Sequence, residues 1–144
     1  VRKKHNPNRA LLAGKRVILV YDSIVRGTTS KKIVQMVRDA GAAEVHFRVA
    51  SPPTTHSCFY GVDTPNTEDL MAHKMDVEEM RRFIGAESMA LVTLNGLYRA
   101  MGEPKRDAQS PQFCDACFSG AYPIALPDIE KGSGGQLSLL ADVA

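Results

Sequence analysis

The sequence has few cysteines, no excess of charge of either sign and no long run of apolar residues. Its 18 basic and 16 acidic residues are mixed along the chain, and the formal net charge of +2 does not favour a nucleic-acid or membrane surface. No apolar run is long enough to cross a bilayer and no signal peptide is apparent, so we expect a cytoplasmic protein. Three cysteines are an odd count, which disfavours a disulfide framework and directs attention to metal binding or redox chemistry.

One stretch near the start of the chain combines a strand pattern, a short polar loop and a helix pattern. Four apolar residues, Val17–Val20, predict a buried strand, and Asp22 stands just past its end. From Thr29 onward apolar residues recur at spacings of three and four, which predicts a helix. The loop between them is rich in hydroxyl side chains. A helix that begins after such a loop presents backbone N–H groups and its dipole to an anion, so the stretch suits a phosphate.

The side chains of this loop fit a phosphate and a sugar together. Gly27 lets the backbone come close to a ligand, and Arg26 offers a charge-assisted hydrogen bond. The hydroxyl donors are Ser23, Thr28, Thr29 and Ser30. The carboxylate of Asp22 suits ribose hydroxyls. The stretch has neither P-loop nor G-x-G-x-x-G spacing, and many turns of this composition only cap a helix, so both interpretations stay open from these residues alone.

The run Y-D-S-I-V-R-G-T-T-S, residues 21–30, resembles the phosphoribosyl-pyrophosphate (PRPP) loop of type I phosphoribosyltransferases, and more narrowly that of amidophosphoribosyltransferases. The resemblance implies that Asp22 contacts the ribose hydroxyls and helps to hold Mg²⁺ around the pyrophosphate. The residues that it implies for PRPP binding are Asp22, Ser23, Arg26, Gly27, Thr28, Thr29 and Ser30. The family has two adjacent acids here, and Tyr21 stands at the position of the first, which removes one carboxylate from the expected ribose and Mg²⁺ site.

The pattern of the remaining chain predicts an α/β fold. The expected elements are a strand over 44–50, an ordered loop over 51–65, helices over 67–73 and 76–84, a strand over 89–94 and a last helix over 95–101. The apolar face of the 76–84 helix is expected to consist of Val77, Met80, Phe83 and Ile84. Asp76 and Glu79 form a capping-box pattern, and Gly41 and Gly85 are placed to end helices. We therefore expect a mostly parallel sheet flanked by helices, with ligands at the carboxyl ends of the strands.

The later loop extends the resemblance. Residues 51–65, S-P-P-T-T-H-S-C-F-Y-G-V-D-T-P, resemble S-P-P-x-x-H-P-C-F-Y-G-I-D-T-P of amidophosphoribosyltransferases, with Ser57 in place of a usual proline. On this basis the expected parts are 1–102 as the C-terminal half of a type I phosphoribosyltransferase domain, 103–127 as a linker and C-x-x-C segment, and 128–144 as a flexible tail. We expect the chain to be a fragment, with a basic arm over 1–8 that is solvated or lies near the pyrophosphate.

Two of the cysteines, Cys114 and Cys117, form a C-x-x-C pair. This spacing lets two thiolates reach one metal, although redox pairs share it. Amidophosphoribosyltransferases of one branch hold a structural [4Fe–4S] cluster on four cysteines, and Cys58, Cys114 and Cys117 match three of them. The fourth lies upstream in the family, so the resemblance implies that this chain alone binds the cluster poorly.

A zinc site is the alternative use of these cysteines. Three thiolates would be completed by His56 or His5 in a Cys₃His site. His46 and His73 are expected to be ordinary strand or surface residues. Metal analysis separates the two interpretations, because one requires iron with sulfide and the other zinc.

The resemblance implies a glycosyltransferase of purine biosynthesis. An intact amidophosphoribosyltransferase releases ammonia from glutamine in an N-terminal domain, and the ammonia displaces pyrophosphate from PRPP to give 5-phosphoribosylamine. The family also implies purine nucleotides as feedback inhibitors and a homo-oligomer, commonly a tetramer. No residue of this chain is expected to be the glutaminase nucleophile, so we expect the chain alone to be inactive. The alternatives are a non-catalytic PRPP-binding regulator and an Fe–S or zinc module with a vestigial PRPP loop.

Overall fold

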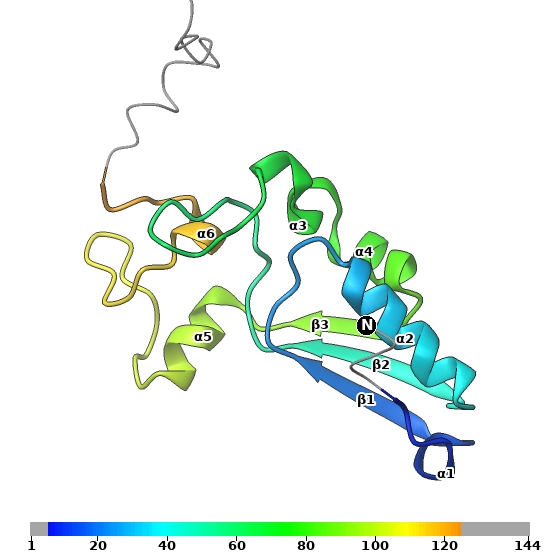
Figure 1. Cartoon of the computed structure of the whole chain (residues 1–144). Coiled ribbons are helices and arrows are strands. Elements are labelled where there is room, and N and C mark those ends of the chain that lie inside the picture. Colours follow the sequence, from blue (N-terminus) through cyan, green and yellow to red (C-terminus); the bar gives the residue numbers. More distant parts are fainter. Residues whose placement is uncertain (1–5, 125–144) are drawn as a thin grey trace, which may run out of the picture.

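The computed structural model describes residues 6–124, which form a parallel sheet with helices over one face (Figure 1). The strands are β1 (Arg16–Tyr21), β2 (Glu44–Val49) and β3 (Ser88–Leu91), in the order β1-β2-β3, and the covering helices are α2 (Thr28–Asp39) and α4 (Val77–Ile84). Both strand pairs are parallel. The expected α/β fold with a parallel sheet is therefore confirmed. The described residues do not include the part of the basic arm over 1–5, which contains the candidate zinc ligand His5, or the tail over 128–144.

The other elements are short. They are α1 (Arg9–Leu12), the 3₁₀ helix η1 (Thr67–Asp69), α3 (Met71–Lys74), α5 (Leu94–Ala100) and α6 (Ala116–Ser119). The predicted 67–73 helix is wrong, because Leu70 is extended and fully buried between η1 and α3. Helix α5 begins one residue earlier than expected because the side chain of Thr93 caps it by accepting from the Gly96 N–H. The third strand ends at Leu91 rather than Leu94, and α1 and α6 were not predicted.

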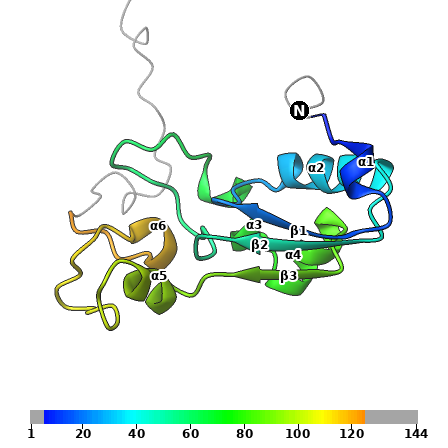
Figure 2. The ribbon, with the colours of Figure 1, turned by 90° about the horizontal axis from the view of Figure 1, so that it is seen from below.

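Strand β1 is half exposed, which corrects the prediction of a buried strand. In the described part of the chain β1 pairs only with β2, and the two helices cover only one face of the sheet (Figure 2). Successive side chains of a strand point to opposite faces. Leu19 therefore packs against the core, whereas the side chains of Ile18 and Val20 are 63% and 73% exposed. Parallel sheets normally have both faces covered, so this face of β1 is available to a further layer.

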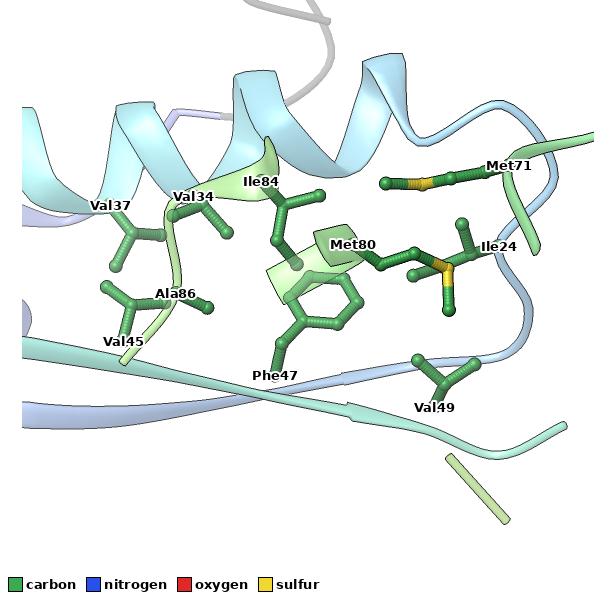
Figure 3. Close-up of a cluster of buried hydrophobic side chains, with 10 residues drawn as sticks. All are labelled: Ile24, Val34, Val37, Val45, Phe47, Val49, Met71, Met80, Ile84 and Ala86. Carbon is green, nitrogen blue, oxygen red and sulfur yellow. The ribbon is translucent and has the colours of Figure 1, made fainter. Parts of the chain in front are cut away.

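The core lies between the sheet and the two covering helices (Figure 3). Its buried members are Ile24, Val34, Val37, Val45, Phe47, Val49, Met71, Met80, Ile84 and Ala86. Met80 and Ile84 confirm the expected apolar face of α4, but Val77, the first residue of the helix, is exposed. Figure 3 shows Met71 and Ile24 at the end of the cluster that adjoins the loop into α2. The core therefore supports that loop directly.

The predicted start and end of α4 rest on local chemistry and are confirmed. The side chain of Asp76 accepts from the Glu79 N–H, and the Glu79 side chain accepts from the Asp76 N–H, so the capping box is complete. Gly85 ends α4 with φ of 79°.

Within residues 6–124, no helix combines the length and apolar character that crossing a bilayer requires.

Replacing Glu87 with glutamine should make the protein less stable at neutral pH, and this loss should become smaller in acid. The carboxylate of Glu87 accepts from the Val45 N–H at 2.6 Å and from Arg38 at 2.6 Å. The hydrogen bond from the Val45 N–H is the main cause that lowers the pKa of the Glu87 carboxyl. Burial raises this pKa and Arg38 lowers it again, so the pKa stays below its usual value. Because the folded pKa is depressed, the stabilisation is present above the unfolded pKa and disappears as pH falls through the folded pKa. The difference between the urea midpoints of variant and parent should therefore be larger at pH 7 than at pH 3. An equal difference at both pH values would contradict this assignment.

Candidate functional site

A cavity of about 580 Å³ lies where β1 passes into α2. It is lined by Tyr21, Ser23, Ile24, Val25, Arg26, Gly27, Thr28, Thr29, Ser30, Asp63 and Pro65. All of the loop residues proposed from the sequence for PRPP therefore meet at one cavity, except Asp22, which was proposed for the ribose and Mg²⁺. The cavity stands at the carboxyl end of a parallel strand, where ligands of α/β proteins commonly bind.

The start of α2 leaves backbone donors for a ligand. Gly27 is the N-cap residue, with φ of 72°, and no side chain accepts a capping hydrogen bond from the first N–H groups of the helix. The first backbone hydrogen bond of the helix runs from the Lys31 N–H to the Gly27 carbonyl at 2.9 Å. The N–H groups of residues 28–30 come before this bond, so they have no carbonyl partner within the helix. The helix dipole favours an anion at the same place. The hydroxyls of Thr28 and Thr29 are exposed beside these donors.

Tyr21 and Asp22 have separate roles. The ring of Tyr21 is half buried and lies 5.3 Å from the ring of Phe47, so it packs on the core while it borders the cavity. Burial, followed by the charge of Asp22, raises the pKa of the Tyr21 phenol, which stays neutral. Asp22 is exposed and accepts from the Ser23 N–H at 2.7 Å. This single carboxylate stands beside the cavity rather than in its wall.

A further part of the cavity wall comes from a loop to which the sequence interpretation assigned no PRPP-binding residue. Asp63 and Pro65 belong to the loop over 51–65, which follows β2. The signal that predicts them is topological: β1 and β2 are parallel neighbours, so the segments after their carboxyl ends emerge side by side. Arg26 points toward a third segment, where its guanidinium lies 3.4 Å from the Asp69 carboxylate in an exposed pair.

Comparison with known proteins relates this chain to one family. An amidophosphoribosyltransferase of Rhizobium etli is 55% identical over 143 residues, which is 98% of this chain and 29% of the relative. One from Synechocystis is 48% identical over 92% of this chain and 26% of its own length. A solved PRPP amidotransferase from B. subtilis, complexed with ADP and GMP, matches 80% of this chain and 25% of its own chain with a TM-score of 0.72 and 49% identity. This chain is a homologue of amidophosphoribosyltransferases.

The homology is to one part of the longer enzymes. The chain matches the C-terminal part of the amidophosphoribosyltransferases and spans less than a third of the length of these curated relatives. No protein-family model matches it. The structural match confirms the type I phosphoribosyltransferase fold.

The three cysteines lie near one another but do not form a complete metal site. The Cys117 carbonyl accepts from the N–H groups of Thr55 and His56, which brings the C-x-x-C segment to the loop that carries Cys58. Burial raises the pKa of the Cys117 thiol, and the charges of Cys58 and Cys114 add to this effect. Backbone N–H groups of Tyr60 and Val62 lower the pKa of Cys58. Residues 6–124 contain no group of three His, Cys, Asp or Glu side chains arranged to hold a metal ion. The described residues thus do not fit a four-ligand amidophosphoribosyltransferase cluster by themselves.

The histidines are engaged in other contacts. The ring of His56 lies 2.9 Å from the Thr55 hydroxyl and lies against Gly120, rather than in a Cys₃His group. His46 lies on β2, where one ring nitrogen meets the Ser88 hydroxyl at 2.8 Å and the other meets the Glu44 carboxylate at 2.9 Å. His73 is exposed on α3.

Proposed function

We propose that this chain is the PRPP-binding part of an amidophosphoribosyltransferase, the enzyme that begins purine biosynthesis. The observation that supports this most directly is the cavity at the start of α2, which gathers the hydroxyl-rich loop, its glycine and its arginine. Helix N-termini with a glycine and hydroxyl side chains suit a phosphate monoester. In the complete enzyme, ammonia derived from glutamine attacks the anomeric carbon of PRPP.

The residues of the chain contribute binding and orientation. The backbone of 27–30, with the hydroxyls of Ser23, Thr28, Thr29 and Ser30, takes the 5′-phosphate, and Arg26 adds charge. Asp22 accepts from the ribose hydroxyls. A C–N bond then forms at the anomeric carbon as the C–O bond to pyrophosphate breaks, and the ammonium product loses a proton. This reaction depends on holding the sugar in position and excluding water, so it needs no covalent intermediate with the chain.

The metals of the family enter only as part of this proposal. Magnesium, when bound, neutralises the leaving pyrophosphate, and Asp22 is the carboxylate beside the cavity that would help to hold it. Cys58, Cys114 and Cys117 match three cluster ligands of the family, but the described residues do not bring them together as a metal group, so we propose a [4Fe–4S] cluster for the complete enzyme only. We also propose purine nucleotides as inhibitors, homo-oligomeric assembly and a cytoplasmic location for the complete enzyme. The nucleotides in the B. subtilis relative, ADP and GMP, support the first of these.

Titration of PRPP into the 144-residue chain tests the proposed function. Calorimetry in the presence of Mg²⁺ should show saturable binding, and ribose 5-phosphate should compete because it carries the same 5′-phosphate. Free ribose, which lacks the phosphate, is the matched control and should not compete. Absence of PRPP binding at millimolar concentration would contradict the proposal.

Tyr21→Asp should tighten PRPP binding and destabilise the fold. The new carboxylate restores the pair of acids that the family resemblance implies, so the gain should appear with Mg²⁺ and disappear in EDTA. The loss of the Tyr21 ring from Phe47 should lower the free energy of unfolding by about 2–3 kcal/mol, because a half-buried aromatic contact is removed. Tyr21→Phe is the control, since it keeps the ring and adds no charge. Equal PRPP affinity for parent and Tyr21→Asp would show that this position does not contact ribose or metal.

A further inference from the structure

Two residues of the cavity wall belong to a loop that has no helix or strand of its own. Asp63 and Pro65 line the cavity, and residues 50–66 contain no regular element. Such a segment keeps its shape only through specific hydrogen bonds and packing. The position of this wall therefore depends on the contacts that hold the loop.

Ser57 is the centre of those contacts. It is 6% exposed, and its hydroxyl donates to the Pro65 carbonyl at 2.7 Å and lies 3.0 Å from the Thr67 hydroxyl. Its N–H donates to the same Thr67 hydroxyl at 3.3 Å. The proline that the family resemblance implies at this position has neither an N–H nor a hydroxyl, so it cannot make these bonds. Ser57 thus fixes Pro65, a wall residue, to the base of the loop.

The segment after the C-x-x-C pair reaches the same residue from the other side. The hydroxyl of Tyr122 donates to the Ser57 carbonyl at 2.6 Å. The Tyr122 ring also packs edge-on against Phe59 and Tyr60, with centroid distances of 5.3 and 6.1 Å. Figure 1 shows α6 beside this loop, and the Cys117 carbonyl accepts from two backbone N–H groups of the loop, at 3.0 and 3.1 Å. The loop is therefore held between the cavity and the C-terminal segment.

We propose that Ser57 and Tyr122 act together as positioning residues that hold Asp63 and Pro65 against the cavity, so that the contact of Tyr122 with Ser57 strengthens the binding of a phosphorylated sugar. Neither residue lines the cavity. The link passes from the Tyr122 hydroxyl to the Ser57 carbonyl, and from the Ser57 hydroxyl to the Pro65 carbonyl. Both hydrogen bonds of this link join protein atoms directly. The proposal rests on the proposed function, because it concerns affinity at the same cavity.

The test uses the 144-residue chain, the variants Tyr122→Phe and Ser57→Ala, and two probes: PRPP with Mg²⁺ and inorganic phosphate. The matched control is Tyr60→Phe, which also loses a hydroxyl that joins the loop to the C-terminal segment, at Ile124, but makes no bond to Ser57. We expect the ribose and pyrophosphate of PRPP to reach the wall formed by Asp63 and Pro65, whereas inorganic phosphate needs only the α2 loop. Calorimetry should show PRPP affinity about three- to tenfold lower for the two variants, the loss that one hydrogen bond carries. Inorganic phosphate affinity should not change, and Tyr60→Phe should resemble the parent.

Hydrogen exchange gives a second readout that needs no ligand. Exchange over 57–66 should be faster in Tyr122→Phe and Ser57→Ala than in the parent, with the core strands unchanged. Equal losses for PRPP and phosphate would overturn the proposal, because they indicate general destabilisation. Unchanged PRPP affinity in both variants would also overturn it. If the parent binds neither probe, the proposed function is wrong, and exchange decides the positioning: faster exchange confined to 57–66 supports it and unchanged exchange overturns it.

Discussion

Substituting Gly27 by alanine is expected to lower the free energy of unfolding by about 2–3 kcal/mol and to weaken PRPP binding more than tenfold. The backbone of Gly27 has φ of 72°, a left-handed conformation that alanine adopts at a cost. A Cβ there would overlap the sulfur of Met71 and lie 3.1 Å from its terminal methyl. The tip of a methionine is flexible, but Met71 is 4% exposed within the core, so it moves only by repacking its neighbours. The first turn of α2, which carries the anion donors, would shift with it.

Gly14→Ala is the matched control for this experiment. Gly14 has nearly the same φ, 70°, and a Cβ there would meet nothing within 4 Å. The control therefore includes the backbone cost, about 1 kcal/mol, without the collision and without contact with the cavity. Urea denaturation and PRPP calorimetry on both variants separate the two contributions. Equal destabilisation and equal affinity in the two variants would show that the approach of Met71 to Gly27 is unimportant.

The features that the sequence predicted are those decided by neighbours along the chain. The capping box of Asp76 and Glu79, the glycine at the end of α4 and the strand–loop–helix transition around Gly27 each involve residues a few positions apart. The alternation of Val45, Phe47 and Val49 likewise marks one face of β2 without knowledge of the rest of the fold. Local hydrogen bonding and side-chain period are sufficient for these elements.

The features that were missed depend on contacts between distant segments. Val20 is as apolar as a core residue, and only the order of the strands reveals that its face is open. Leu70 interrupts a helical pattern because burial of its side chain outweighs the helix propensity of its neighbours. Asp63 enters the cavity wall because two parallel strands end side by side. None of these facts is encoded within a short window, so spacing alone could not supply them.

Asp115→Ala should release the C-terminal segment, with a local destabilisation of about 3–5 kcal/mol, because it leaves a buried guanidinium without its partner. Asp115 is 3% exposed and accepts from Arg106 at 2.5 and 3.1 Å, while the Arg106 side chain is 13% exposed. Tyr98, on α5, donates to the same carboxylate at 2.8 Å. Burial pushes the pKa of Asp115 upward, but the hydrogen bonds from Arg106, Ser119 and Tyr98 lower it overall, so the carboxylate is ionised at neutral pH. This network fastens the segment expected to be a linker.

Limited trypsin digestion measures this release, because cleavage after Arg106 requires the segment to leave its site. Asp115→Ala should be cut much faster than the parent, and Tyr98→Phe only slightly faster, since it removes one hydroxyl and leaves the ion pair. The double variant Arg106→Met with Asp115→Leu should regain much of the lost stability, because an apolar pair of similar volume needs no compensating charge. Since this variant lacks the trypsin site at residue 106, its stability is measured by hydrogen exchange of α5 and α6. If Asp115→Ala and Tyr98→Phe were cut equally fast, the ion pair would carry no more of the docking than a single hydroxyl does, and the segment would be held chiefly by the contacts of Tyr122 and Cys117 with the loop.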